Sequence, residues 1–475
     1  MATARADVLS ARERMGDWKR YPYVPDWGDP ERFTFPDCDG HRADLGMATY
    51  FVDGFLRGQT SGREYAFMTI VTDMRVVGKR LRASFYTFAL YDRGARRYGT
   101  YTDYDFPAPP RIRRRYKLEA ARGYLGLRYA ASAGPVRWEN TRDARGALTP
   151  FAWTLDLRGR DHHGSEMALT LDIDASRPPA PLGGRALGGE MMFLGLPSTF
   201  SYFQSGLRMR GELAWGDQRE AVEGDVGWID RQWADHDFSR HQDRQSARYR
   251  NEWRVMQFGN GWDMSCFHQY LRPARNAVVP WTGMSAQGPG PEFDIRSTTQ
   301  VTLEIPEFIR SPGIVRGREM LTDGPRYFPY RYRLLAPELG LDVSAEPWVD
   351  APAHDLPIEY WTGPVTLSGR AWDAPVTGVG FDERSRPWIR GFEIAEAIRH
   401  TVAHLPDLAP EPRALLVYRA WEVEALAFRD AAAAHRHVTR HLVPLLDPLP
   451  TAIRERLTTM IRDLSTVLAS RRRLP

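Results

Sequence analysis

The sequence predicts a mainly β protein, built from two antiparallel β-barrel or half-barrel domains and a helical C-terminal extension. From about residue 48 onward, apolar and polar residues alternate with period two in runs separated by turn residues, which is typical of antiparallel strands. Strand-like and helix-like segments do not alternate there, so a parallel α/β sheet is not expected. At 475 residues the chain is longer than single cores usually grow. Two folded β-domains are therefore expected.

The first β-domain is expected over residues 45–245. Residues 1–44 carry Pro, Asp and Trp without steady periodicity, which predicts a short helix and an irregular lead-in. Aromatic and β-branched runs then follow one another, with DRGARR as a hairpin turn, and the barrel should close near Trp233. The strand-like runs are ATYFVDGFLRG, REYAFMTIVTDMRVV, LRASFYTFALYDRGARRYGTYTDYDF, PFAWTLDLRGRDHHGSEMALTLDIDA and GLRMRGELAWGDQREAVEGDVGWIDRQW.

A charge-dense stretch near residues 239–250 marks the boundary to a second β-domain, expected over residues 246–390. It opens with WRVMQFGNGWDMSCFHQYL, in which two strand-like runs meet at a Gly-Asn-Gly turn. Beyond Phe392 the apolar spacing becomes helical, with Pro-rich breaks, so residues 391–475 are expected to form a helical extension.

Composition narrows the function classes. The 64 basic and 60 acidic residues nearly balance, so a nucleic-acid partner is not expected. Cys38 and Cys266 stand far apart without a CxxC motif, which fits a reducing cytoplasm and argues against a cysteine zinc site. We find neither an apolar signal segment nor a run long enough to span a bilayer, so no integral membrane association is expected. Aromatic residues are abundant, at 12%.

Two segments stand out, GLRMRGELAWGDQREAVEGDVGWIDRQWAD and PIEYWTGPVTLSGRAWDAPVTGVGFDE. The first resembles the closing hairpin of the carotenoid 1,2-hydratase and AttH-like family, which includes cyclases of the Diels-Alderase type. The second is similar to the late Y-W-x-G strand of that family and the G-x-G-aromatic segment that follows it. The first motif consists of Val222, Gly224, Gly227, Trp228, Asp230 and Trp233, and the second of Tyr360, Trp361, Gly363, Gly378, Gly380, Phe381 and Glu383.

The resemblance covers roughly residues 45–388. The sequence departs from the family pattern at Thr362, where members often carry Glu, and at the SRPW segment, where members often carry Gly-Tyr. The resemblance implies a lipocalin-like fold that encloses a lipophilic small molecule.

Asp230 is the leading catalytic candidate because it stands between Trp228 and Trp233. A carboxyl surrounded by indoles loses solvation, which raises its pKa and keeps it protonated as a general acid. The alternative is structural: Asp230 pairs with Arg231 or another arginine and fixes the barrel seam, while the tryptophans form core.

Other candidates are weaker. His236 in the polar linker would relay protons, although a solvated loop histidine fits as well. Tyr360 would orient a polar end of the substrate. Because strand side chains alternate between faces, the sequence leaves open which aromatic residues line a cavity and which only pack. The substrate-binding candidates are Trp228, Trp233, Tyr65, Tyr202, Gln257, His268 and Trp361.

No metal or cofactor is expected. His400 and His404 are four residues apart, and a second histidine cluster follows at 435–441, but no HExxH frame accompanies them. The chain also lacks GxSxG, GxxxxGK[ST] and GxGxxG motifs, which argues against serine hydrolase, P-loop and Rossmann functions.

The sequence thus favours an enzyme of the lyase or isomerase type that acts without a cofactor. It would hydrate, cyclise or isomerise a polyene, terpenoid or polyketide in a β-barrel cavity, with Asp230 as the acid. Two alternatives remain open: a pericyclase that works by shape alone, and a carrier that binds a hydrophobic metabolite without turnover.

Overall fold

The structure of the protein is a computed structural model that describes residues 18–42, 45–76, 80–106, 115–193, 196–235, 249–271, 282–290, 293–311, 326–350, 352–354, 359–386 and 390–469. By their contacts, these residues divide into two compact units. The first lies within residues 1–240, 255–266 and 283–299, and the second within residues 241–254, 267–282 and 300–475. The domain boundaries expected from the sequence stay predictions.

The first unit is built on a 14-stranded antiparallel sheet with the strand order β4-β3-β2-β1-β14-β13-β9-β8-β7-β6-β5. β12 pairs with β14, and β10 and β11 pair with β12. Hairpins join most neighbours, as the period-two runs predict. The strands are β1 Met47–Gly58, β2 Glu64–Val76, β3 Leu81–Asp92, β4 Arg97–Asp105, β5 Leu118–Ala120, β6 Gly126–Ala131, β7 Gly134–Arg142, β8 Leu148–Arg160, β9 Glu166–Ala175, β10 Ala180–Pro181, β11 Glu190–Phe193, β12 Leu196–Ser205, β13 Leu207–Trp215 and β14 Gln218–Ala234, with the short helix α2, Gly184–Leu187, after β10.

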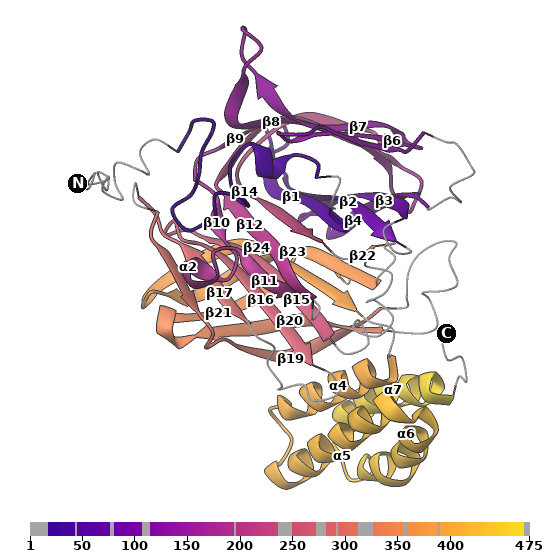
Figure 1. Ribbon diagram of the computed structural model, residues 1–475. Helices are drawn as coiled ribbons and strands as arrows, with labels where there is room; N and C mark the ends of the chain where they lie inside the picture. The colour runs from indigo at the N-terminus through magenta and orange to yellow at the C-terminus, as the bar shows by residue number, and fades with distance from the viewer. Residues whose placement is uncertain are drawn as a thin grey trace, which may run out of the picture. The chain divides into compact units, whose positions relative to one another are not determined.

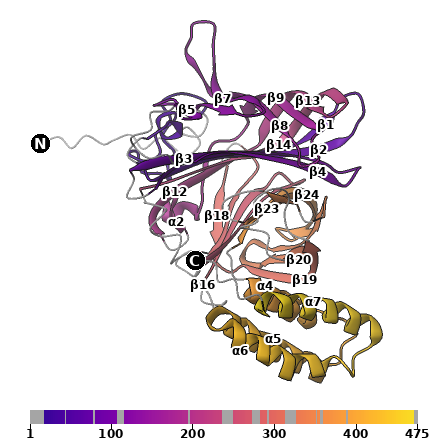
Figure 2. The same cartoon turned by 90° about the vertical axis from the view of Figure 1, so that its right-hand side faces the viewer.

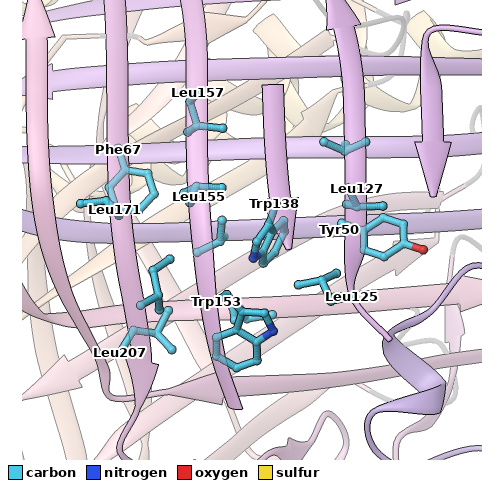
Figure 3. Packing of buried hydrophobic residues seen from close by; sticks show 14 of the residues in the cluster. Tyr50, Phe67, Leu125, Leu127, Trp138, Trp153, Leu155, Leu157, Leu171 and Leu207 are labelled. Atoms are coloured by element: carbon cyan, nitrogen blue, oxygen red, sulfur yellow. The ribbon is translucent and has the colours of Figure 1, made fainter. Parts of the chain in front are cut away.

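This sheet curls so that its two arms face each other, as the first strands and β7–β9 show in Figure 2. The phenol of Tyr86 on β3 donates to the carbonyl of Arg158 on β8 at 3.0 Å, and that of Tyr129 on β6 donates to the carbonyl of Asp103 on β4 at 3.1 Å. The space between the arms is filled by aromatic and aliphatic side chains, among them Phe67, Trp138 and Trp153 (Figure 3). The first barrel is therefore nearly closed around a packed core.

The lead-in joins this core. Tyr23 and Phe35 form an isolated β-bridge, and the 3-10 helix η1, Asp37–Asp39, follows. Phe35 packs edge-on against Tyr202 at 5.0 Å between ring centroids. The short helix predicted near the N-terminus lies outside the described residues.

Glycine is sterically required at position 224 of the first motif. At Gly224 a Cβ atom would lie 2.0 Å from the carbonyl oxygen of Phe55, where a register shift separates Phe55 from Arg57 in the pairing of β1 with β14. Only glycine allows this close approach of the two strands.

The second sheet has ten strands in the order β18-β17-β16-β15-β24-β23-β21-β20-β19, and β22 pairs with β23 (Figure 1). The pairs β17–β18, β19–β20, β20–β21, β21–β23 and β23–β24 are antiparallel, so the protein is mainly β as predicted. The strands are β15 Tyr249–Phe258, β16 Asp263–Leu271, β17 Gly283–Gln287, β18 Ile295–Thr298, β19 Thr302–Ser311, β20 Arg326–Ala336, β21 Leu341–Pro347, β22 Ala353–His354, β23 Glu359–Ala371 and β24 Ala374–Arg386, with the 3-10 helix η4, Pro337–Leu339, before β21.

The helical extension is present and belongs to the second unit. It contains α4 Arg390–Ala403, α5 Pro410–Arg429, α6 Ala431–His437 and α7 Thr451–Ala469, with π and 3-10 turns, η5 Val438–Leu442 and η6 Val443–Leu445, before α7. α4 packs on β19 and β20, and Asp463 of α7 accepts from both Arg310 and Tyr327 at 2.7 Å. Among the described residues, no helix is long and apolar enough to cross a membrane.

Candidate active site

Strand β14 places the leading candidate residues on opposite faces of the first sheet. Side chains alternate along a strand, so Trp228 and Asp230 share one face while Arg231 and Trp233 share the other. The face with Arg231 and Trp233 contributes to the packed core, and we name the face with Trp228 and Asp230 the acid face. The sequence prediction that both indoles flank Asp230 is thus met by Trp228 but not by Trp233.

Asp230 is buried and has neutral hydrogen-bond partners. Ser201 on β12 donates to one carboxyl oxygen at 3.1 Å, and the amide of Gln232 donates to the other at 3.3 Å. Burial raises the pKa of Asp230 to about 7, although both hydrogen bonds and the charge of Arg231 oppose the rise. The carboxyl therefore carries a proton over a large part of the neutral range, which a general acid requires.

Apolar groups surround this carboxyl on the acid face. Phe51 of β1 and Phe203 of β12 lie directly opposite Asp230 in the two strand pairings, and both are buried. Trp228, two residues before Asp230, packs edge-on against Phe55 at 6.2 Å between ring centroids. Aromatic faces at such positions stabilise a nearby positive charge.

The acid face also carries polar groups. Thr49 and Thr72 share a hydrogen bond of 3.3 Å between their hydroxyls, and Thr87 and Thr102 share one of 3.2 Å. Ser205, opposite Trp228, donates to Asp263 at 2.5 Å. Asp263 is also paired with Arg177 at 2.9 Å, and burial raises its pKa to about 6. Since this second carboxyl has a cationic partner, it is less suited than Asp230 to deliver a proton.

Arg231 holds the opposite face together. Its guanidinium lies 3.6 Å from the ring centroid of Tyr50 and donates to the carbonyls of Thr49 and Gln232 at 3.1 and 3.0 Å. A further bond of 3.3 Å reaches the carbonyl of Gly40 in the lead-in. Arg231 therefore bonds backbone oxygens, and Asp230 is not held by the arginine next to it.

Tyr202 and Trp233 belong to this opposite face as well. The Tyr202 phenol donates to the carboxyl of Asp39, whose pKa burial raises to about 6. Trp233 packs against Phe33 at 5.3 Å and stacks on Phe200 at 6.0 Å between ring centroids. Tyr65 lies on β2 opposite Leu56 and donates to Glu220 at 2.8 Å. These three predicted site residues are thus separated from Asp230 by the sheet or by distance along it.

Three other predicted site residues lie in the second unit. Trp361 on β23 stacks on Phe328 at 5.9 Å between centroids, while Tyr360 points to the other face and packs against His354 at 5.9 Å. His268 on β16 is buried, and burial, reinforced by the charge of Arg254, lowers its pKa to about 4. His268 is therefore neutral near pH 7.

The second unit also contains a buried cluster of charges. Arg254 contacts Glu252 at 2.9 Å and Asp382 at 3.0 Å, and Arg384 lies 3.5 Å from Glu252 and 3.8 Å from Asp382. The Tyr332 phenol donates to Asp382 at 2.8 Å. The two cations and two anions balance, which lowers the cost of burying all four.

The remaining candidates add little. Gln257 on β15 is half-buried, and His236 lies outside the described residues. Within the part of the chain that the structure describes, no group of three or more His, Cys, Asp or Glu side chains is arranged to hold a metal ion.

Comparison with known proteins agrees with this architecture. The AttH-like family matches residues 112–383, more than half of the chain. The chain belongs to the AttH-like family. A crystal structure of a putative AttH from Nitrosomonas europaea matches with a TM-score of 0.53 at 17% identity, covering 77% of this chain and all of that one. Kievitone hydratase from Nectria haematococca matches with a TM-score of 0.51 at 13% identity, covering 77% of this chain and 98% of that one.

A structure of CghA with Sch210972 also matches this AttH-like protein, with a TM-score of 0.40 at 10% identity over 72% of this chain and 89% of that one. Among proteins with curated descriptions, none matches the chain in sequence. The family resemblance inferred from the two motifs is confirmed.

Several residues of the AttH-like fold were not singled out from the sequence. Ser201 contacts Asp230 only through the pairing of β12 with β14, which a single sequence does not specify, whereas Gln232 lies on the same face two residues further along β14. The charged cluster did leave a signal, because Glu252 and Arg254, like Asp382 and Arg384, are opposite charges two residues apart in strand-like runs. Such spacing puts both charges on one face of a strand.

Proposed function

We propose that this AttH-like protein is a cofactor-free enzyme of the lyase or isomerase type. It protonates an unsaturated bond of a lipophilic small molecule, and water then adds to the resulting cation. The observation that carries the proposal is Asp230, a buried carboxyl held by two neutral groups, whose pKa burial raises to about 7. Hydration is the outcome we propose by analogy with kievitone hydratase, which has a similar fold.

The chemistry balances without a cofactor. The O–H bond of Asp230 breaks as a C–H bond forms at one alkene carbon, which leaves a carbocation and a carboxylate. The π-faces of Phe51, Phe203 and Trp228 stabilise the cation, and a water oxygen then bonds to it. The released water proton returns the site to its starting state, so the net reaction is alkene plus water to alcohol.

Ring closure is a second outcome of the same protonation. If a second double bond of the substrate reaches the cation before water does, a C–C bond forms and loss of a proton gives an isomer. The apolar walls around Asp230 favour this outcome for a long polyene.

The experiment combines the purified protein with kievitone and, in parallel, with a metabolite extract of a host strain that lacks the gene. Mass spectrometry follows which compound is lost and what replaces it. A gain of about 18 Da indicates hydration and an unchanged mass indicates cyclisation. Asp230→Asn should reduce either activity by about 10²-fold or more, and Asp39→Asn, on the opposite face, is the matched control.

Unchanged turnover by Asp230→Asn would reject acid chemistry and favour the shape-directed pericyclase. Tight binding of an unaltered metabolite by both proteins would favour a carrier.

A further inference from the structure

Asp53 is another carboxyl on the acid face, and it lies beside Asp230. In the pairing of β1 with β14, Asp53 stands opposite Trp228 and Phe51 stands opposite Asp230. Asp53 is thus the diagonal cross-strand neighbour of Asp230 on the same face, a relationship that separates the two Cα atoms by about 7–8 Å. Asp53 is completely buried, and Asp230 is 7% exposed.

The indole of Trp228 provides an independent observation at the same place. It is completely buried, and within the described residues its N–H has no hydrogen-bond acceptor. A buried donor of this kind is costly unless an acceptor fills the site. Since Trp228 is opposite Asp53 and two residues from Asp230, the oxygen of a water or substrate hydroxyl between the carboxyls is the acceptor that fits.

We propose that Asp53 is the second catalytic carboxyl of this site, the base that removes a proton from water as the water adds to the substrate, with the Trp228 N–H holding the water oxygen. This inference rests on the hydration chemistry proposed for Asp230. It assigns a residue to the step in which the adding water loses its proton.

The proton balance then closes within the site. Asp230 gives its proton to carbon, water forms the C–O bond, and the water proton passes to the Asp53 carboxylate. A solvent water returns that proton from Asp53 to Asp230 for the next turnover. Carboxyl pairs that work with a water between them in glycoside hydrolysis lie about 6.5–9.5 Å apart. Diagonal neighbours on one face, with Cα atoms about 7–8 Å apart, can hold their carboxyls at such a separation.

The charged groups around the pair are consistent with one shared proton. Tyr91 on β3 faces Asp53, and the negative charge of Asp53 is among the causes that raise the pKa of Tyr91. Arg231 acts on Asp230 through the strand, and Asp263 beyond Ser205 is paired with Arg177. Two carboxyls buried this close together do not both ionise readily, so one stays protonated.

The first test needs no substrate. In protein with ¹³C-labelled aspartate, the Asp230 carboxyl is assigned by its loss in Asp230→Asn and titrated by NMR in wild type and in Asp53→Asn. If Asp53 is ionised, its removal lowers the pKa of Asp230 by about one unit or more. An unchanged Asp230 titration would mean that Asp53 carries no charge and would overturn its role as base.

The second test uses kievitone in D₂O to separate protonation of the alkene from addition of water. Asp53→Asn should still exchange deuterium into the alkene through Asp230, while water addition falls about 10²-fold. Asp53→Glu should restore part of the addition, and Trp228→Phe, which keeps an aromatic side chain but lacks the indole N–H, should weaken it. Equal loss of exchange and addition in Asp53→Asn would contradict a role at the water step.

The same variants distinguish the two proposals. Full activity of Asp230→Asn rejects the proposed function itself. An inactive Asp230→Asn together with Asp53→Asn at the wild-type rate rejects only the role of Asp53.

Discussion

Asp230 and Arg231 are consecutive in the chain, yet their charges act on opposite faces of β14. The Asp230 carboxyl accepts from Ser201 and Gln232, whereas the Arg231 guanidinium bonds carbonyls and covers the ring of Tyr50. The strand thus keeps the nearest cation from forming an ion pair with the acid. This separation is what leaves the carboxyl of Asp230 able to hold a proton near pH 7.

Activity should fall as the pH rises through about 7, because Asp230 is active in its protonated form. Above its pKa the acid form decreases tenfold per pH unit, and kcat/KM should decrease with it. The measurement is kcat/KM from pH 5 to 9 on the compound consumed in the extract assay. A flat profile would speak against acid catalysis and for a reaction driven by shape.

Asp230 should also cost the protein stability at neutral pH. Its pKa is about 7 in the folded state against 3.8 for the unfolded chain. Between these values the folded state binds the extra proton, so the free energy of unfolding declines as the pH rises through this window and levels off above 7. The decline attributable to Asp230 is about 4 kcal/mol.

Asp230→Asn removes this titration and keeps the size of the side chain. Denaturant melts of wild type and variant at pH 4, 6 and 8 should show the variant gaining relative stability at each step. A difference in unfolding free energy that does not change with pH would show that Asp230 is not buried in its protonated form.

Arg231→Met should destabilise the first unit by about 1–3 kcal/mol. The substitution removes the hydrogen bonds that Arg231 donates to the carbonyls of Thr49, Gln232 and Gly40, and it removes the cation from the ring of Tyr50. Chemical denaturation measures the loss, and Arg208→Met, at an exposed position of β13, is the control with an expected change within about 0.5 kcal/mol. Equal effects of the two substitutions would refute this role of Arg231.

The fold was predictable because period-two patterns and turn residues recur along most of the chain, and strands follow them closely. The side of the barrel on which a residue lies was not predictable. Trp228 and Trp233 look equivalent in the motif, but they are an odd number of residues apart, so they point to opposite faces. Asp53 became a neighbour of Asp230 only through the pairing of β1 with β14, which joins residues far apart in sequence.

Gly224→Ala tests why the first motif contains glycine. The added methyl group would lie 2.0 Å from the carbonyl oxygen of Phe55, so the strands must separate at the register shift. We expect a loss of about 2–3 kcal/mol in unfolding free energy. Gly94→Ala, where the nearest atom is 3.6 Å away, is the matched control and should be nearly neutral.

Arg254→Met tests the charged cluster of the second unit. Removing one cation leaves Glu252 and Asp382 with Arg384 alone, so the buried cluster becomes net negative and the unit should lose about 3–5 kcal/mol. Replacing Glu252 by Leu in the same protein restores the charge balance, and the double variant should lose less than Arg254→Met alone. The pKa of His268 reports on the charge of Arg254 separately from packing, because that charge lowers the pKa of His268. In an NMR titration, Arg254→Met should raise the pKa of His268 above its value of about 4. A double variant as unstable as the sum of both single changes, with His268 unshifted, would show that these charges do not act as one cluster.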